Sequence, residues 1–88
     1  MKNAIERYLA YLKAVRNASP HTLRSYRNDL DQFREFLSPP GAPEVRLREI
    51  DHRVIREFLG HLHDRKLQKR SIARKLASLR SLFKFCLR

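Results

Sequence analysis

Apolar side chains recur every three or four positions along most of the chain, which is the repeat of an α-helix that buries one face. Four segments carry this repeat, and residues that favour helix ends or loops separate them. The pattern predicts an all-α fold with helices over residues 2–16, 20–37, 52–65 and 69–87. We expect the four helices to form one compact bundle around a single core.

Residues suited to helix ends and loops mark the boundaries. Ser19 before Pro20 places a hydrogen-bond acceptor at the cap and a proline at the first helical position. Asp51 holds the same capping position before the third helix. The prolines and glycine within residues 38–43 exclude a helix there and predict a surface loop. Gly60 inside the third helix predicts a close contact with a neighbouring helix, since glycine otherwise costs about 1 kcal/mol relative to alanine.

The last predicted helix has two contrasting sides. Its apolar side carries Ile72, Leu76, Leu79, Phe83 and Cys86. We expect Cys86 to serve there as a small buried apolar side chain. The opposite side combines cations with small residues: Arg70, Arg74, Ala77, Ser81, Lys84 and Arg88. Leu82 and Phe85 belong to neither side, which predicts an apolar pair without a partner surface.

Positive charge is concentrated in this last segment. The 88 residues include 20 Lys and Arg against 9 Asp and Glu, for a net charge of +11. Residues 65–88 hold nine of the basic side chains and no acidic one. Such a surface attracts polyanions, of which nucleic acid is the commonest, with an anionic membrane as the competing partner. Like charges on one helix repel each other, and no acidic residue in this segment offsets that cost. A helix that is only solvated gains nothing in return, so nucleic-acid binding is favoured.

Length and composition exclude several classes of protein. A chain this short encloses no large substrate cavity, so we expect no enzyme activity from it alone. No segment approaches the roughly 20 apolar residues of a membrane span, and the chain does not start with an apolar signal core. A single cysteine forms no internal disulfide, which fits a cytoplasmic location. The sequence contains no motif for a metal or another cofactor.

The start of the second predicted helix is a further candidate binding site. A helix N-terminus presents unpaired N–H groups and partial positive charge, and both favour a phosphate. Polar side chains surround it: His21, Thr22, Arg24, Ser25 and Asn28. A capping residue followed by an exposed first turn explains the same residues equally well, so both interpretations stay open.

Two runs of sequence together resemble a known family. They are SPHTLRSYRNDLDQF at residues 19–33 and RSIARKLASLRSLFKF at residues 70–85. In combination they resemble the N-terminal core-binding domain of tyrosine recombinases, most closely the Xer and phage-integrase branch. The resemblance covers essentially the whole chain. It implies a SAM-like orthogonal bundle that forms half of a C-shaped clamp on duplex DNA, with the second and fourth helices crossing the major groove.

The resemblance also implies which side chains face DNA. Carried over by position, they are His21, Thr22, Arg24, Ser25, Asn28, Arg70, Ser71, Arg74, Lys75 and Ser78, with Arg27 as the alternative to Asn28. A structure in which Arg70 and Arg74 turn inward or form internal ion pairs contradicts this interpretation. Gln68 stands where many relatives have a Ser or Thr cap, so the fourth helix can start one or two residues away from the expected position.

Members of the family cut DNA with a separate C-terminal catalytic domain, which this chain lacks. Tyr8, Tyr11 and Tyr26 match no family nucleophile, and their positions on or beside apolar stripes predict packing instead. The resemblance implies that the parent protein is a tyrosine recombinase that breaks and rejoins DNA without metal or nucleotide. The expected partners of the domain are double-stranded DNA, the catalytic domain of the same parent chain, and further copies in a tetramer.

Two other interpretations belong to different functional classes. A stand-alone basic regulator or nucleoid-type protein is also small and helical, and it should dimerise to read two half-sites. A protein-interaction module would instead dock a partner through Leu82 and Phe85 and use its cations for solubility.

Overall fold

The computed structural model describes residues 1–87, which form four α-helices and one short 3₁₀ helix. The α-helices are α1 (Lys2–Ala14), α2 (Pro20–Leu37), α3 (His52–Asp64) and α4 (Lys69–Cys86). The 3₁₀ helix η1 (Leu47–Glu49) lies in the loop before α3. Within residues 1–87 the structure has no β-strand, and the prediction of an all-α fold is confirmed.

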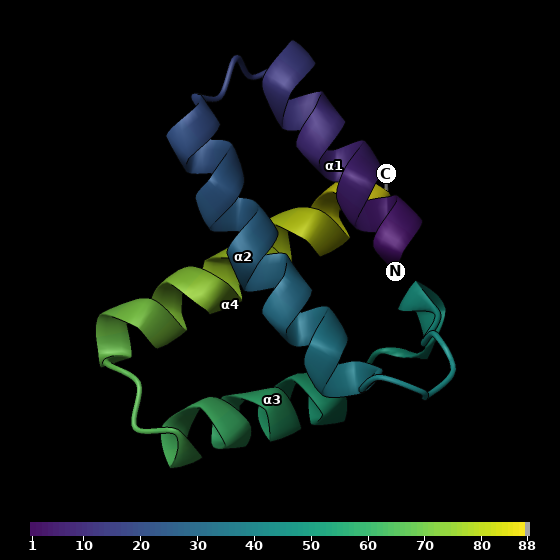
Figure 1. The fold of residues 1–88 in the computed structure, drawn as a ribbon, viewed down its shortest axis with the longest axis vertical. Coiled ribbons are helices and arrows are strands. Elements are labelled where there is room, and N and C mark those ends of the chain that lie inside the picture. The colour runs from purple at the N-terminus through teal and green to yellow at the C-terminus, as the bar shows by residue number, and fades with distance from the viewer. Residues whose placement is uncertain (88) are drawn as a thin grey trace.

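Helix α2 occupies the centre of the fold. In Figure 1 it runs across the front of the molecule, and α4 crosses behind it. Helix α1 packs against both α2 and α4, and α3 contacts α4. The Cα radius of gyration is 12.9 Å, close to the about 12 Å expected for a compact chain of this length. Among the described helices, none is long and apolar enough to cross a membrane.

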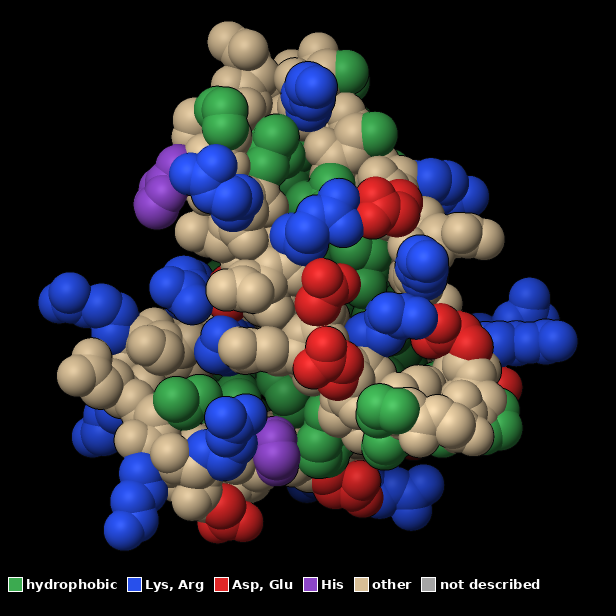
Figure 2. Space-filling model, in the orientation of Figure 1, with side chains coloured by type: hydrophobic (Ala, Val, Ile, Leu, Met, Phe, Trp, Pro, Cys, Tyr) green, Lys and Arg blue, Asp and Glu red, His purple; other side chains and the backbone are tan. Residues whose placement is uncertain are grey.

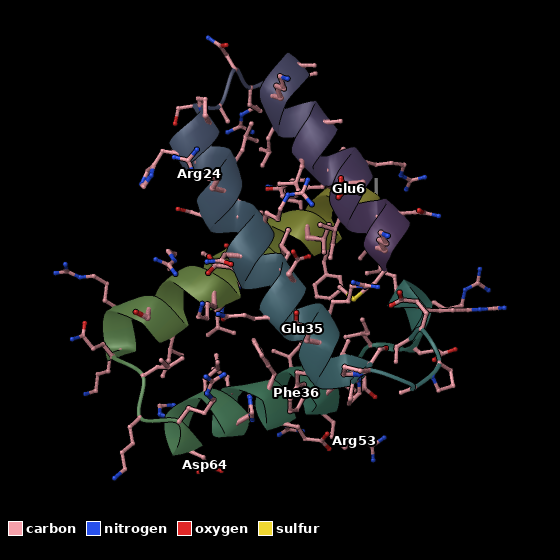
Figure 3. All side chains as sticks on the ribbon, viewed as in Figure 1. Glu6, Arg24, Glu35, Phe36, Arg53 and Asp64 are labelled. Atoms are coloured by element: carbon pink, nitrogen blue, oxygen red, sulfur yellow. The ribbon has the colours of Figure 1, made fainter. Side chains whose placement is uncertain are left out.

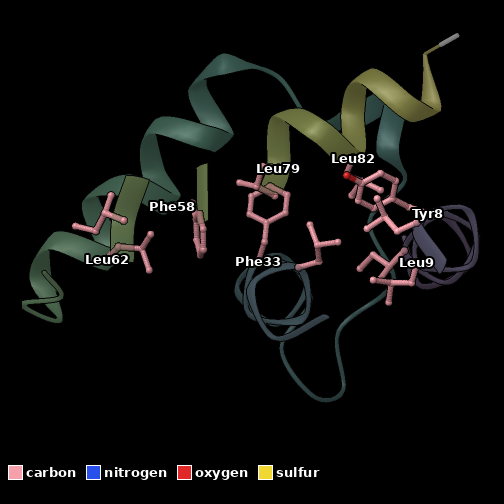
Figure 4. Packing of buried hydrophobic residues seen from close by; sticks show 11 residues of the cluster. Tyr8, Leu9, Phe33, Phe58, Leu62, Leu79 and Leu82 are labelled. Atoms are coloured by element: carbon pink, nitrogen blue, oxygen red, sulfur yellow. The ribbon is translucent and has the colours of Figure 1, made fainter. Parts of the chain in front are cut away.

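One core joins the four helices. Its buried apolar members are Ile5, Tyr8, Leu9, Leu12, Leu30, Phe33, Phe58, Leu62, Ile72, Leu79 and Leu82. Phe33 of α2 meets Phe58 of α3 edge to face, with the ring centroids 5.0 Å apart (Figure 4). This aromatic pair attaches α3 to the centre of the bundle.

The helix starts follow the predicted capping chemistry. Ser19 Oγ accepts a hydrogen bond from the N–H of Thr22 at 3.1 Å. Asp51 Oδ1 accepts one from the N–H of Val54, also at 3.1 Å. Helix α4 begins directly after Gln68, which caps it without a side-chain hydrogen bond. The shift of this start that Gln68 suggested does not occur.

The helix ends differ slightly from the predicted ranges. Helix α1 stops at Ala14 rather than at residue 16, and Asn17 beyond it has a left-handed φ of 53°. Val15 is consequently 66% exposed and does not join the apolar stripe of α1. Lys66, two residues beyond the end of α3, also has a left-handed φ, of 59°, a conformation typical of the residues that follow helix C-termini.

Two predictions about packing are wrong. Gly60 is exposed, and a Cβ placed on it meets no atom within 4 Å, so it permits no close helix contact. Leu82 is fully buried, and the ring of Phe85 packs 5.3 Å from that of Tyr8 and 4.9 Å from that of Tyr11. The apolar pair thus packs against the chain's own core, which removes the docking surface of the protein-interaction module.

The buried side of α4 is rotated relative to the predicted side. Lys75 and Ser78 are 5% and 3% exposed, whereas Leu76 is only half-buried. Both sets of positions fit a helical repeat, and the prediction chose the set without a charged residue. Lys75 is nevertheless inside the bundle, because a carboxylate from α2 meets it there.

Candidate nucleic-acid interface

A buried polar cluster joins α2 to α4 around Asp29, whose side chain is 1% exposed. Arg74 donates from Nε to Oδ2 at 3.1 Å and from Nη2 to Oδ1 at 3.0 Å. Lys75 Nζ donates to Oδ1 and Ser78 Oγ to Oδ2, each at 3.0 Å. Because these bonds satisfy both carboxylate oxygens, the cluster fixes how α4 is rotated against α2.

Arg74 connects this cluster to the surface. Its side chain is 55% exposed, and Nη1 makes no hydrogen bond to another described residue. With two cations and one carboxylate, the cluster keeps a formal charge of +1. The expectation that Arg74 avoids internal ion pairs is therefore wrong. Arg70 meets the same expectation, since it is exposed and pairs with no carboxylate among residues 1–87.

A hollow of about 170 Å³ lies between the start of α2 and the middle of α4. Its lining comes from both helices: His21, Thr22, Ser25, Tyr26, Asp29, Arg74, Ala77 and Ser78. Five of these residues are among those expected to face DNA. The fold thus brings the two runs of sequence that carry the family resemblance to one place on the surface.

The other expected DNA-facing residues are not part of the lining of this hollow. Arg24, Asn28 and Arg70 are exposed, and Ser71 is half-buried. Figure 3 shows Arg24 on the first half of α2, and this residue lines a different hollow, between α1 and α2. Lys75 and Ser78 do not project outward as expected, because their polar atoms bind Asp29 inside the bundle.

Charge is unevenly distributed over the surface seen in Figure 2. Lys and Arg side chains project along the left margin, where α4 begins, and also along the right margin, whereas several Asp and Glu side chains lie over the middle of the view. Glu6 on α1 pairs with Arg27 of α2 at 2.6 Å, and hydrogen bonding to this guanidinium lowers the pKa of Glu6. Arg27 is thus neutralised, whereas Arg24 and Arg70 pair with no carboxylate among the described residues.

The buried cluster contains one residue that the sequence pattern did not single out. Asp29 lies three residues after Tyr26 on the apolar side of α2, and Lys75 lies three residues after Ile72 on that of α4. A lone charge at a core position of each of two helices is a signal for a buried ion pair. This signal was present in the sequence.

The chemistry at the described surface is that of cations, hydroxyl groups and an imidazole. Such groups bind phosphate through hydrogen bonds and charge. No three His, Cys, Asp or Glu side chains in the described part of the chain are close enough to hold a metal ion together. Cys86 is half-buried rather than fully buried, and burial raises the pKa of its thiol.

Known proteins similar to this chain define its family. Residues 5–88 match the family described as phage integrase, N-terminal SAM-like domain. The chain is 41% identical over 87 residues to the tyrosine recombinase XerC of Chlorobaculum parvum, and 37% identical over 81 residues to that of Oceanobacillus iheyensis. These alignments cover 94% and 92% of this chain but 26% of each relative. No solved structure matches the chain significantly. The chain belongs to the phage-integrase N-terminal SAM-like domain family.

Proposed function

We propose that this chain is the DNA-binding N-terminal domain of a site-specific tyrosine recombinase, and that it clamps duplex DNA at the recombination core site. Its family and its likeness to two XerC recombinases support the recombinase assignment. The observation that carries the DNA-binding part is the shared surface of α2 and α4. There, Arg74 of α4 and polar side chains of α2 line a hollow whose one carboxylate is already neutralised, and Arg70 lies exposed one turn before Arg74 on α4.

The start of α2 provides one set of phosphate ligands. Its dipole favours an anion, and Ser19 keeps this end of the helix in place through the N–H of Thr22. His21 and Ser25 follow on the side of the hollow, and Arg24 is an exposed cation of the same helix. These groups bind the backbone and so position the domain on the duplex.

Helix α4 provides the second set. Arg70 is free to bind a phosphate or the edge of a guanine, since it has no carboxylate partner among the described residues. Arg74 offers only its remaining nitrogen Nη1, held in a fixed direction by the two bonds to Asp29. A side chain fixed in this way loses little conformational entropy when it binds.

Strand cleavage belongs to the rest of the recombinase. The domain holds DNA while the catalytic domain of the parent chain attacks the phosphodiester, and the parent acts as a tetramer without metal or nucleotide. Because the proposed partner is cellular DNA, we expect the domain to act in the cytoplasm. The chain spans about a quarter of its relatives, 26% of each, which is consistent with a separate catalytic portion.

The salt dependence of DNA binding tests this proposal. The affinity of the chain for a short fluorescent duplex should fall by orders of magnitude between about 50 and 200 mM salt if several phosphates are bound. Arg70→Ala should reduce the slope of log affinity against log salt by about 0.9, because the variant binds one phosphate fewer. Fluorescence anisotropy measures both quantities, and circular dichroism checks that helicity is unchanged.

Arg56→Ala is the matched control, because Arg56 is an exposed cation on α3 whose removal changes the net charge equally. The control should leave the slope within error of the unmodified chain. If Arg70→Ala and Arg56→Ala behave alike, or if the unmodified chain does not bind DNA, the proposal is wrong.

A further inference from the structure

A second hollow lies farther along α4, beyond the residues assigned to DNA above. Its volume is about 270 Å³. The lining residues are Tyr8, Tyr11, Leu12, Arg16, Tyr26, Ser81, Lys84 and Phe85. They include two cations, three phenols and one aliphatic hydroxyl, but no carboxylate.

The two cations of this hollow lack a counter-charge. Arg16 and Lys84 are exposed, and neither pairs with a carboxylate in the part of the chain that the structure describes. Arg16 follows α1 and Lys84 is in the last turn of α4, so two elements deliver positive charge to one place. Each cation suits a helix C-terminus by itself. Their meeting around a hollow lined by hydroxyl groups is what favours a bound anion.

The hydroxyl groups and the charges are close together. Burial raises the pKa of the Tyr8 phenol, while a hydrogen bond with Ser81 and the charge of Arg16 act in the opposite direction. Arg16, the Tyr8 phenol and the Ser81 hydroxyl all line the hollow. Hydroxyl donors beside cations are a common way of binding phosphate oxygens.

The second hollow also continues the surface assigned to DNA. Tyr26 lines both hollows. One side of α4 connects them, because its residues follow each other at helical spacing: Arg70, Arg74, Ala77, Ser81 and Lys84.

The distance along α4 matches the width of a DNA groove. Arg74 and Lys84 are ten positions apart, which is about 15 Å at about 1.5 Å per helical residue. The major groove of B-DNA is about 12 Å wide. A helix that crosses the groove with Arg74 near one strand therefore brings Lys84 to the backbone of the other strand.

We infer that Arg16 and Lys84 form a second anion site, which binds a backbone phosphate on the strand across the groove from Arg74. Tyr26 supplies a hydroxyl group for the same phosphate. The inference rests on the proposed function and extends it, since it adds the end of α1 to the interface. Two phosphate contacts at opposite ends of α4 fix the direction in which this helix crosses the duplex.

A double variant tests the second site. Arg16→Ala with Lys84→Ala should lower the slope of log affinity against log salt by about 0.9, the value for one phosphate contact. The probe is the same mixed-sequence fluorescent duplex, bound by the 88-residue chain. Arg53→Ala with Arg56→Ala removes two cations from exposed positions of α3, of which Arg53 lies 3.9 Å from Asp51, and should leave the slope unchanged. Arg53 lies on the outer side of α3 in Figure 3.

Tyr26→Phe separates the hydroxyl contact from the charge. The ring packs edge to face on Tyr8 at 6.1 Å, and phenylalanine keeps this packing while it removes the hydroxyl. Affinity should fall by about twofold to tenfold at every salt concentration, as expected when one hydrogen bond is removed. The slope should not change, because no charge is removed. Unchanged affinity would contradict the role assigned to Tyr26.

The outcomes distinguish this inference from the proposed function. If the Arg16/Lys84 variant binds like the Arg53/Arg56 control while Arg70→Ala still lowers the slope, the second site is wrong and the proposed function stands. If Arg70→Ala also binds like the control, DNA binding through α4 is wrong, and the second site fails with it. A lowered slope for both variants supports the site.

Discussion

Asp29 determines, at the scale of a single residue, which side of α4 faces the core. Its carboxylate is almost fully buried and is held by three side chains of α4. A buried ion pair often stabilises a protein no more than apolar residues of the same size do. Removing one partner is different, because the other charge is then left in the interior without compensation.

Asp29→Asn should therefore lower the free energy of unfolding by about 3–5 kcal/mol, the usual cost of breaking a buried ion pair. Lys75, at 5% exposure, is the charge that is left without its partner. The added substitution Lys75→Met should restore most of this stability, because methionine fills similar space without a charge. Urea denaturation, followed by circular dichroism, measures the free energy of unfolding of the unmodified chain, of Asp29→Asn and of the double variant.

Asp31→Asn is the control for this experiment. Asp31 lies two positions further along α2, is half-buried and forms no ion pair with another described residue. Its substitution should change the stability by no more than about 0.5 kcal/mol. Equal stabilities of the Asp29 and Asp31 variants would show that the cluster does not hold α2 and α4 together.

At the scale of the element, α3 has a well-formed start. The N–H of Val54 binds the Asp51 carboxylate, and this bond, followed by the charge of Arg53, lowers the pKa of Asp51. A carboxylate with a lowered pKa in the folded state stabilises the fold above its unfolded-state pKa. That stabilisation is lost as the pH falls through the folded-state value.

Asp51→Ala should accordingly lower the melting temperature near neutral pH. The difference from the unmodified chain should shrink in acid, below both pKa values, because Asp51 is then protonated in either state. Calorimetry at the two pH values makes the comparison. A difference that is the same at both would contradict a role for the ionised carboxylate.

The interior of α3 contains an avoidable weakness. Gly60 is exposed, and nothing lies within 4 Å of a Cβ at this position. Gly60→Ala should raise the free energy of unfolding by about 1 kcal/mol, because alanine favours the helix and restricts the unfolded chain. Gly41→Ala should do the opposite, since Gly41 has a φ of +89° that a side chain disfavours. Thermal denaturation of both variants checks the signs, and a destabilised Gly60→Ala would contradict the open surface seen there.

The helices could be predicted from the sequence more completely than their mutual packing. Ser19 and Asp51 mark their helices by local chemistry, so α2 and α3 begin where the pattern places them. The rotation of α4 depends on a partner in α2. Because the sequence alone does not show that Asp29 contacts α4, it predicts Lys75 to be a surface cation and Leu82 to be an exposed apolar residue.

For the whole molecule, the candidate site was only partly predictable for the same reason. The sequence places cations on α4 and polar groups at the start of α2, and the fold brings Arg74 and those polar groups around one hollow. The sequence does not show that Asp29 accepts hydrogen bonds from two nitrogens of Arg74, because this contact joins positions that are distant in the chain. The second hollow likewise depends on how the end of α1 lies against α4.

For the whole molecule, some cations of this basic chain are paired with carboxylates and others are not, which bears on the face that the proposed function assigns to DNA. The net charge of +11 alone predicts attraction to any polyanion. The ion pairs of Glu6 with Arg27 and of Glu44 with Arg34 neutralise two arginines of α2 that are not part of the first hollow. Arg24 and Arg70 pair with no carboxylate among the described residues.

An amide NMR titration of the 88-residue chain with a short DNA duplex shows most directly which face binds. Binding through α2 and α4 predicts that the largest shifts fall within residues 20–28 and 70–84, with little change in α3. Largest shifts in η1 and α3, around Arg46 and Arg48, or an absence of shifts at any DNA concentration, would contradict it.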